Sequence, residues 1–327
     1  MKGKCTMKIV ILDAYTTNPG DLSWEWLAEF GEYAVYDFTR PEDVLERAAD
    51  CEIVFTNKTV LGKDLLSRIY PLQYIGLLST GTNVVDLAYT AERGIPVTNI
   101  PSYSKSAVAQ MTFAHILELC NQVGLHNTAV KNGEWSANRN FCFWKSPLVE
   151  LYQKTIGIIG FGKIGRAVAD IAQAMEMNVI AYSPHAGDES RRNNFRFAEL
   201  DELLGLSDIV TMHCPLTQET EKMANAVFFA KMKSSAFFIN TSRGGVVDET
   251  ALAHALNSGI IAGAGVDVLS TEPPQAANPL MNCEKCFITP HIAWAGYETR
   301  KRLVGILAEN LRAFINGSPV NVVNGAG

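Results

Sequence analysis

No apolar run in this sequence reaches the ~20 residues that a membrane-spanning helix needs. Basic residues are not in excess either: 28 lysine and arginine residues stand against 34 aspartate and glutamate residues, for a formal net charge of −6. A nucleic-acid-binding face needs clustered lysine and arginine, so this balance argues against that class of protein. The first apolar stretch ends at Asp13, which is too short for a signal-peptide core. We interpret residues 1–6 as an extension or an alternative initiation ahead of Met7.

Cysteine is sparse, with seven residues, an odd number, scattered along the chain. This usage favours a reducing compartment, the cytoplasm, over a disulfide framework. The spacing Cys283-x-x-Cys286 suggests a metal, but a zinc site needs two more ligands, and His291 alone does not supply them. We therefore expect unpaired thiols and no metal site.

The 327 residues contain no low-complexity linker and no internal repeat, and their number suggests two domains. Strand-like runs alternate with amphipathic ones along almost the whole chain, which is typical of α/β folds with parallel sheets. We expect a first, five-stranded unit that ends near Pro101 and a second unit, with six strands, that begins at Thr155. The predicted strands are Lys8–Leu12, Ala34–Phe38, Ile53–Thr56, Tyr74–Leu78, Val97–Asn99, Thr155–Ile159, Val179–Tyr182, Ile209–His213, Ala236–Asn240, Gly263–Val268 and Cys286–Pro290.

A long, partly apolar helical segment is predicted from Ser104 to about Gly133, and the loop after it is rich in aromatic residues. Exposed aromatic side chains there would belong either to a subunit interface or to a second-layer core contact. Shorter helices are predicted over residues 41–49, 249–257 and 297–316, with Pro41 at a first helical position and Gly259 and Gly317 at C-terminal ends.

Glycine forms one functional pattern near the middle of the chain, Gly160-Phe161-Gly162-Lys163-Ile164-Gly165. It matches G-x-G-x-x-G, in which the first glycine permits a tight turn, the second lets the backbone approach a pyrophosphate, and the third lets helix and strand pack closely. A buried strand precedes it and an amphipathic helix follows, so a helix N-terminus would offer N–H groups to phosphates. The alternative is a glycine-rich turn without a ligand. In this context the pattern predicts a dinucleotide-binding domain.

Three polar segments after the fingerprint follow predicted strands, where open α/β sheets bind their ligands. Arg243 lies on a loop between serine and glycine and is suited to bidentate binding of a carboxylate. Asp267 and Glu272 come just past an apolar strand, and His291 ends the last one as a candidate acid/base group. Taken singly, these are more simply a surface arginine, a solvated acid and a structural histidine. Together, behind a dinucleotide motif, they form a strong candidate catalytic site.

On these residues the chain resembles the D-isomer-specific 2-hydroxyacid dehydrogenase family over nearly its full length. The segments that carry the resemblance are GIIGFGKIG, HCPLT at 213–217, NTSRGGVVDETAL at 240–252, GVDVLSTEP at 265–273 and TPHIAWA at 289–295. The resemblance implies an α/β architecture with a flavodoxin-like substrate domain and an inserted Rossmann dinucleotide-binding domain. We expect the substrate domain at residues 1–102 plus 293–327 and the cofactor domain at residues 103–292. A homodimer is also implied, with the helix and aromatic loop after Ser104 as its interface.

The resemblance implies a role for each catalytic residue. Arg243 would bind the substrate carboxylate, His291 would be the general acid/base, and Glu272 would orient that histidine. Backbone N–H groups would bind the carboxylate from a second side. The residues expected around the substrate, besides Arg243, are Asn57, Lys58, Ser79, Thr80 and Gly81. Those expected around the cofactor are Val108, Thr112, Gly160, Gly162, Lys163, Ile164, Gly165, Ser183, His213, Cys214, Pro215, Thr220, Thr241, Ser242, Asp267 and His291.

Residues 57–58 and 108–110 and Trp294 make the chain most similar to the glycerate dehydrogenase/hydroxypyruvate reductase branch, although many relatives carry glutamate where Gln110 stands. This implies hydride transfer between a nicotinamide dinucleotide and a small 2-keto acid. Alternatives are a dehydrogenase for phosphoglycerate, D-lactate or glyoxylate, or a non-catalytic, corepressor-like protein that responds to the dinucleotide. The fingerprint calls for an acid about 20 residues on, to bind the adenosine ribose. Ser183 stands there instead, so we expect NAD, with NADP as an alternative.

Overall fold

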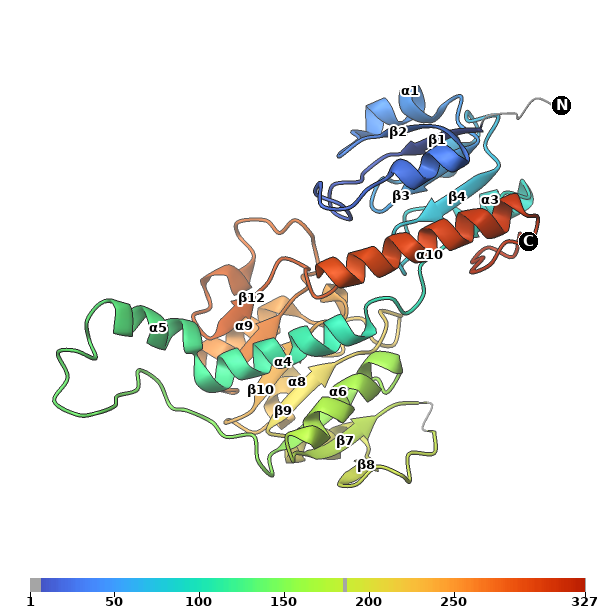
Figure 1. Cartoon of the computed structure of the whole chain (residues 1–327). Coiled ribbons are helices and arrows are strands. Elements are labelled where there is room, and N and C mark those ends of the chain that lie inside the picture. The colour runs from blue at the N-terminus through green and yellow to red at the C-terminus, as the bar shows by residue number, and fades with distance from the viewer. Residues whose placement is uncertain (1–6, 185–186, 327) are drawn as a thin grey trace. The chain divides into compact units, whose positions relative to one another are not determined.

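Two parallel β-sheets organise the chain, and the helices between their strands cover them (Figure 1). The structure is a computed structural model that describes residues 7–184 and 187–326. The interpretation of residues 1–6 as an extension lies outside the described residues. In the described part of the chain, none of the helices combines the length and apolar character needed to cross a membrane.

The first sheet has five parallel strands in the order β2-β1-β3-β4-β5, the flavodoxin-like order that the sequence predicts. Its strands are β1 (Met7–Ile11), β2 (Gly31–Val35), β3 (Ile53–Thr56), β4 (Tyr74–Leu77) and β5 (Val97–Thr98). The helices of this unit are α1 (Val44–Ala48), α2 (Lys63–Leu66), α3 (Leu87–Glu92) and α10 (Tyr297–Ile315). The strand order reverses between β1 and β3, and the carboxyl ends of these two strands are therefore the expected place for a ligand.

The second sheet has seven parallel strands in the order β12-β11-β10-β9-β6-β7-β8, which is a Rossmann order with one strand added. Its strands are β6 (Thr155–Ile159), β7 (Asn178–Tyr182), β8 (Phe195–Phe197), β9 (Ile209–Met212), β10 (Phe237–Asn240), β11 (Gly263–Val266) and β12 (Cys286–Ile288). The helices are α4 (Lys105–Asn121), α5 (Val123–Lys131), α6 (Lys163–Ala174), α7 (Leu200–Leu206), α8 (Ala226–Lys231) and α9 (Glu249–Asn257). Here the order reverses between β6 and β9.

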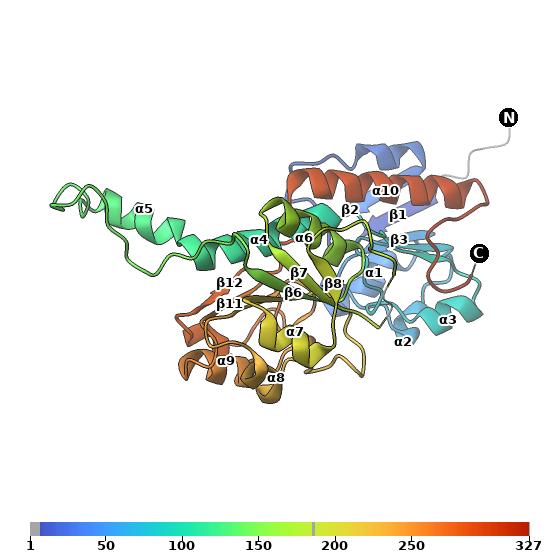
Figure 2. The same ribbon diagram turned by 90° about the horizontal axis from the view of Figure 1, so that it is seen from below.

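Helices cover both faces of the seven-stranded sheet, which explains why its central strands are mostly apolar (Figure 2). Successive side chains of a strand point to opposite faces, so Ile158 packs in the cluster under α4 and α6, whereas Ile159 packs in the cluster under α7, α8 and α9. The apolar contributors from these helices include Phe113, Ile116, Val168, Leu203, Phe228, Phe229, Leu252 and Leu256. Two buried cores therefore hold the strand ends in fixed positions.

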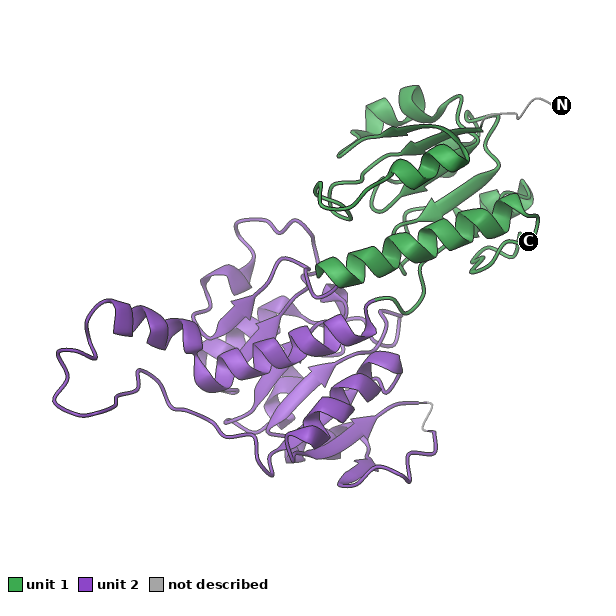
Figure 3. Ribbon diagram, in the orientation of Figure 1, with its two compact units in different colours: residues 1–103, 295–327 green, residues 104–294 purple. Residues whose placement is uncertain are grey.

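The chain divides into two compact units, one of residues 1–103 with 295–327 and one of residues 104–294 (Figure 3). The first unit contains the five-stranded sheet and is completed by α10 from the far end of the chain. Within that unit, Leu303, Leu307 and Leu311 of α10 are fully buried at a spacing of four residues, which is one face of a helix. The second unit contains the seven-stranded sheet and the glycine fingerprint.

Strand β8 and the helix after Ser104 differ from the sequence prediction. Strand β8 was not predicted, because it is only three residues long and is held at the sheet edge by contacts of Phe195 and Phe197 with Phe161. The predicted helix over 104–133 is two helices, because the backbone of Gln122 adopts a left-handed conformation at φ 45° and ends α4. Helix α5 and the loop after it extend away from the rest of their unit (Figure 1).

Candidate active site

The glycine fingerprint lies between β6 and α6, beside the point where the strand order reverses. Gly160 has a φ of +92°, and a Cβ atom there would lie 2.5 Å from the backbone nitrogen of Cys214. A Cβ at Gly165 would lie 2.3 Å from the carbonyl oxygen of Gly160, so these two glycines are required by packing. Gly162 is the N-cap of α6, and a Cβ there would meet nothing within 4 Å. The helix N-terminus, which begins with Lys163 and Ile164, is thus open to an anion such as a pyrophosphate.

The loop after β9 borders the same strand ends and carries His213, Cys214 and Pro215. The Thr220 hydroxyl closes this loop by donating to the carbonyl oxygen of Pro215 at 2.7 Å. The Nε2 atom of His213 bonds to the hydroxyl of Thr211, whereas its buried Nδ1 has no partner among the described residues. Burial lowers the pKa of His213 to about 3, so the ring is neutral at physiological pH. A bound molecule that reaches Nδ1 of His213 can supply the missing hydrogen-bond partner.

Arg243 follows β10 on a loop whose backbone is hydrogen-bonded to the buried side chain of Asn240. Asn240 accepts hydrogen bonds from the backbone N–H and the hydroxyl of Ser242, at 3.0 and 2.8 Å, and donates to the carbonyl oxygen of Arg243 at 2.9 Å. The Arg243 side chain is exposed, and its Nη1 donates to the carbonyl oxygen of Ser242 at 2.7 Å. A Cβ at Gly244 would lie 1.9 Å from the carbonyl carbon of Leu269, so this loop packs directly on the segment that leads to Glu272.

Helix α4 braces the Arg243 loop from the other side. Thr112 is fully buried, and its hydroxyl bonds to the hydroxyl of Thr241 at 2.9 Å and donates to the carbonyl oxygen of Val108 at 2.9 Å. Thr112 and Thr241, both expected at the cofactor, are thus joined to one another.

His291 and Glu272 form the ion pair that the sequence leads us to expect. Nδ1 of His291 lies 2.6 Å from Oε2 of Glu272, and the other carboxylate oxygen accepts from the backbone N–H of Leu269 at 3.0 Å. About a third of each side chain is exposed, 31% for the histidine and 34% for the glutamate. With Nδ1–H directed at the carboxylate, Nε2 is the atom that can take up or release a proton.

The backbone of His291 is strained. Its φ of +54° lies in the left-handed region, which a non-glycine residue adopts rarely and mostly at functional sites. The backbone N–H of His291 donates to the carbonyl oxygens of Asp267 and Thr289, at 2.8 and 2.9 Å. The buried carboxylate of Asp267 accepts from the N–H groups of Ile292 and Ala293, both at 2.9 Å. Asp267, expected at the cofactor, thus also shapes the turn that presents His291.

In the first unit, the predicted substrate residues lie at the carboxyl ends of β3 and β4. The carboxylate of Asp13, which follows β1, accepts from the backbone N–H groups of Asn57 at 2.8 Å, Lys58 at 2.5 Å and Thr59 at 2.8 Å. Asn57 is buried and its side chain donates to the hydroxyl of Thr16 at 3.0 Å, whereas the Lys58 side chain is exposed. Asp13 therefore builds the turn that presents Lys58, a role that the sequence reasoning missed.

The turn after β4 is also fixed by its own side chains. The hydroxyl of Ser79 donates to the carbonyl oxygen of Gly81 at 2.8 Å, and that of Thr80 donates to the carbonyl oxygen of Ile100 at 2.7 Å. The backbone N–H groups of Ser79, Thr80 and Gly81 have no partner among the described residues. Three adjacent N–H groups of this kind are suited to an anion.

Comparison with known proteins identifies the family. The sequence model described as "D-isomer specific 2-hydroxyacid dehydrogenase, NAD binding domain" matches residues 113–293. The chain belongs to the D-isomer-specific 2-hydroxyacid dehydrogenase family. It is 48% identical to a hydroxypyruvate reductase of Blautia hydrogenotrophica, over 97% of this chain and 100% of the relative. It is 36% identical to a glycerate dehydrogenase of Methylorubrum extorquens, over 97% and 99%.

A similar fold occurs in the NADPH-dependent glyoxylate/hydroxypyruvate reductase of Sinorhizobium meliloti, solved in complex with NADP and malonate. The TM-score is 0.81 at 26% identity, and 97% of this chain and 96% of that chain are covered. As a member of this dehydrogenase family, the chain is an NAD(P)-dependent oxidoreductase that acts on CH–OH groups. Its dinucleotide is thus the ligand expected at the open N-terminus of α6.

The structure brings part of the predicted site together within the second unit of this dehydrogenase. The Arg243 loop packs on the segment leading to Glu272, and Glu272 bonds to His291. The fingerprint glycines and the residues after β9 line one sheet edge. The individual roles in binding and catalysis remain predictions. Thr289 and His115 were not expected, because they act through hydrogen bonds between distant parts of the sequence. The supporting role of Asn240 was not expected either, although its bonds are local.

Proposed function

We propose that this dehydrogenase is a hydroxypyruvate reductase, which acts in the opposite direction as a D-glycerate dehydrogenase. The His291–Glu272 pair at 2.6 Å carries the reaction class, because a histidine oriented by a carboxylate is suited to proton transfer at an alcohol or carbonyl oxygen. The substrate is supported by the hydroxypyruvate reductase relative, 48% identical over the whole of its length.

In the reducing direction, His291 donates the proton on Nε2 to the carbonyl oxygen of the keto acid. The nicotinamide dinucleotide, when bound, supplies the hydride. Glu272 stabilises the imidazolium form of His291 before transfer and holds the ring in place. The guanidinium group of Arg243 binds the substrate carboxylate and offsets negative charge that develops on the oxygen. Neutral His291 accepts the proton back in the oxidative direction.

The first unit offers donors of its own among the residues expected to bind the substrate. The unpaired N–H groups of Ser79, Thr80 and Gly81 bind the carboxylate, and the exposed ammonium group of Lys58 adds positive charge to a neighbouring turn. Asn57, although buried, supports the Lys58 turn through its bond to Thr16. A small, hydroxylated 2-keto acid offers oxygen acceptors for these donors.

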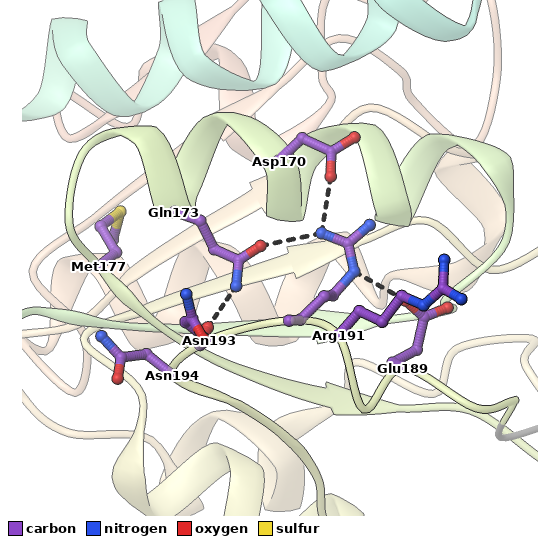
Figure 4. A pocket seen from close by; sticks show the side chains of 8 residues that line it. Asp170, Gln173, Met177, Glu189, Arg191, Asn193 and Asn194 are labelled. Atoms are coloured by element: carbon purple, nitrogen blue, oxygen red, sulfur yellow. Dashed lines mark hydrogen bonds and ion pairs between the residues drawn. The ribbon is translucent and has the colours of Figure 1, made fainter.

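We infer that NADH is preferred over NADPH, in spite of the serine at position 183. Two arginines near the loop after β7 are already paired: Arg166 lies 2.6 Å from Glu189, and Arg192 lies 2.7 Å from Glu189 and 2.6 Å from Asp170. Arg192 and its partners line a surface pocket of about 480 Å³. Figure 4 shows Asp170, Gln173 and Glu189 around the guanidinium group that they bind. A 2′-phosphate near these arginines would have to compete with their carboxylate partners.

We further propose that the protein is a homodimer. We also propose that it acts in the cytoplasm, because its few, scattered cysteines favour a reducing compartment. Helix α5 and the following loop expose apolar side chains at Val123 (67%), Trp135 (51%), Phe141 (89%) and Trp144 (66%), more than a monomer surface usually gathers on one segment. Light scattering at micromolar protein concentration should give twice the mass of one chain. A monomer at that concentration would contradict this assembly.

Steady-state kinetics with a panel of 2-keto acids test the proposed function. We expect kcat/KM to be highest for hydroxypyruvate among hydroxypyruvate, glyoxylate, pyruvate and 3-phosphohydroxypyruvate, and higher with NADH than with NADPH. A clear preference for the phosphorylated acid would reassign the substrate. Dinucleotide binding without turnover of any member of the panel would favour the corepressor-like alternative.

A further inference from the structure

Helix α4 carries a buried histidine outside the proposed catalytic set. His115 is only 4% exposed, and its Nε2 lies 3.0 Å from the hydroxyl oxygen of Thr289, two residues before His291. The helix can approach so closely because the facing position on β11 is a glycine: a Cβ at Gly265 would lie 2.7 Å from the Cβ of His115. The strand thus leaves room for an imidazole that reaches the turn beyond it.

The hydrogen bonds around Thr289 determine which atom donates. The Thr289 hydroxyl donates its single proton to Oδ1 of Asp267 at 2.5 Å. Its oxygen can therefore only accept from His115, which requires a proton on Nε2 of the histidine. Burial lowers the pKa of His115, with an opposing contribution from the charge of Asp267, and this favours the neutral ring. The contact with Thr289 then places its single proton on Nε2.

This chain of donors ends at the turn that holds His291. Asp267 receives the Thr289 hydroxyl on one side of His291 and the N–H groups of Ile292 and Ala293 on the other. These bonds hold the residues that flank the left-handed backbone of His291, a conformation that persists only where the surroundings enforce it. One face of α4 braces both catalytic loops, since Thr112, three residues before His115, bonds to Thr241 next to the Arg243 loop.

We propose that His115 is a positioning residue for proton transfer: through Thr289 and Asp267 it holds the turn that aims His291. It touches none of the reacting groups itself. The inference rests on the proposed role of His291 as the acid/base, and it adds a residue on a distant helix that sets the geometry of this role.

Mutation of both ends of the contact tests the proposal. His115→Leu removes the donor, His115→Gln keeps an N–H near the position of Nε2, and Thr289→Val removes the acceptor. We expect His115→Leu to lower kcat by roughly 10- to 100-fold, as small misplacements of catalytic groups do, while KM and the affinity for NADH change little. His115→Gln should recover most of kcat. In the Thr289→Val background, His115→Leu should add less than about a further twofold, because the two residues act as one unit.

Leu119→Ala is the matched control, because Leu119 lies one turn along the same face of α4 and packs on Gly263 of the same strand. It should lower Tm and leave kcat of the folded enzyme unchanged. Rates are compared with the 2-keto acid that the wild type reduces fastest, so a different preferred substrate would not affect the test. His291→Ala is measured in parallel: full activity of that variant overturns the proposed function of His291.

The proposal itself is overturned if His115→Leu keeps wild-type kcat while His291→Ala is inactive, or if His115→Gln is as slow as His115→Leu. Multiplicative losses for His115→Leu and Thr289→Val would also overturn it. A measurement independent of activity is histidine NMR of the wild type, in which the nitrogen shifts of His115 should report protonation at Nε2. Protonation at Nδ1 would contradict the assigned donor.

Discussion

Replacement of Glu272 by glutamine removes the charge that faces His291 and keeps the size and a hydrogen-bond acceptor. The carboxylate lies 2.6 Å from Nδ1 of the histidine and is anchored by the N–H of Leu269 at 3.0 Å. Glutamine has one carbonyl oxygen and can keep one of these two contacts, because the carboxylate accepts from Leu269 with Oε1 and from His291 with Oε2. The variant thus separates the charge of Glu272 from its steric role.

The structure sets the size of the expected effect. Opposite charges about 4 Å apart attract by about 1 kcal/mol in bulk water and about 4 kcal/mol at an effective dielectric constant of 20. Because both side chains are about one-third exposed, we expect a value near the lower end, about 1–2 kcal/mol. That loss of imidazolium stabilisation corresponds to a kcat for keto-acid reduction about 5- to 30-fold lower at neutral pH.

Stopped-flow measurement of single-turnover reduction between pH 5 and 8 reports this step. Glu249→Gln is the matched control, because Glu249 anchors the same segment by accepting from the N–H of Ser270 at 2.6 Å and from Asn278 at 2.8 Å without contacting His291. The control should keep kcat within about twofold of the wild type, as expected for a site that does not couple to the reaction. Equal losses in Glu272→Gln and Glu249→Gln, or no loss in Glu272→Gln at any pH, would refute the electrostatic role of Glu272.

Three further predictions follow from the site. His291→Ala should lower kcat by ~10²–10⁴-fold, and near-normal turnover would remove His291 from catalysis. Ser183→Asp should raise the NADH-to-NADPH ratio of kcat/KM by about tenfold, through repulsion of a 2′-phosphate, and an unchanged ratio would show that position 183 does not read the ribose. The folded pKa of His213, about 3, lies below its ordinary 6.5, so the unfolded chain binds the extra proton between these pH values. The free energy of unfolding, measured with urea, should therefore fall as pH decreases from 6.5, and this group contributes up to about 1.4 kcal/mol per pH unit to the fall. The free energy of unfolding of His213→Asn should fall less over the same pH range. Parallel curves for the wild type and the variant would contradict the assignment.

The sequence predicted the strands best where a short apolar run is buried on both faces. β3 (Ile53–Thr56) and β6 (Thr155–Ile159) agree with the prediction at both ends, as does α9. The prediction was wrong for β2, which it placed at Ala34–Phe38 and which begins at Gly31. That strand starts early because Gly31 pairs with Met7, and a Cβ at Gly31 would lie 1.9 Å from the Met7 carbonyl oxygen. Pairing partners of this kind are invisible in a local pattern.

The candidate site shows the same difference between residues that a local sequence pattern identifies and residues that depend on long-range contacts. Gly160 could be found from the spacing of the glycine motif, and His291 could be named as a candidate from its place at the end of a predicted strand and from the family resemblance. His115 could not, because its partner Thr289 is 174 residues away and the packing of α4 on Gly265 decides their contact. Asp13 could have been found, since it directly follows the first strand of the five-stranded sheet, at the point where the strand order reverses.

The most direct test of the account is the product formed from hydroxypyruvate and NADH. We predict that the purified protein consumes one NADH for each hydroxypyruvate reduced and that chiral chromatography of the product shows D-glycerate. Formation of L-glycerate, or no NADH oxidation under conditions in which the protein binds NADH, would contradict the assignment of this chain as a hydroxypyruvate reductase of D specificity.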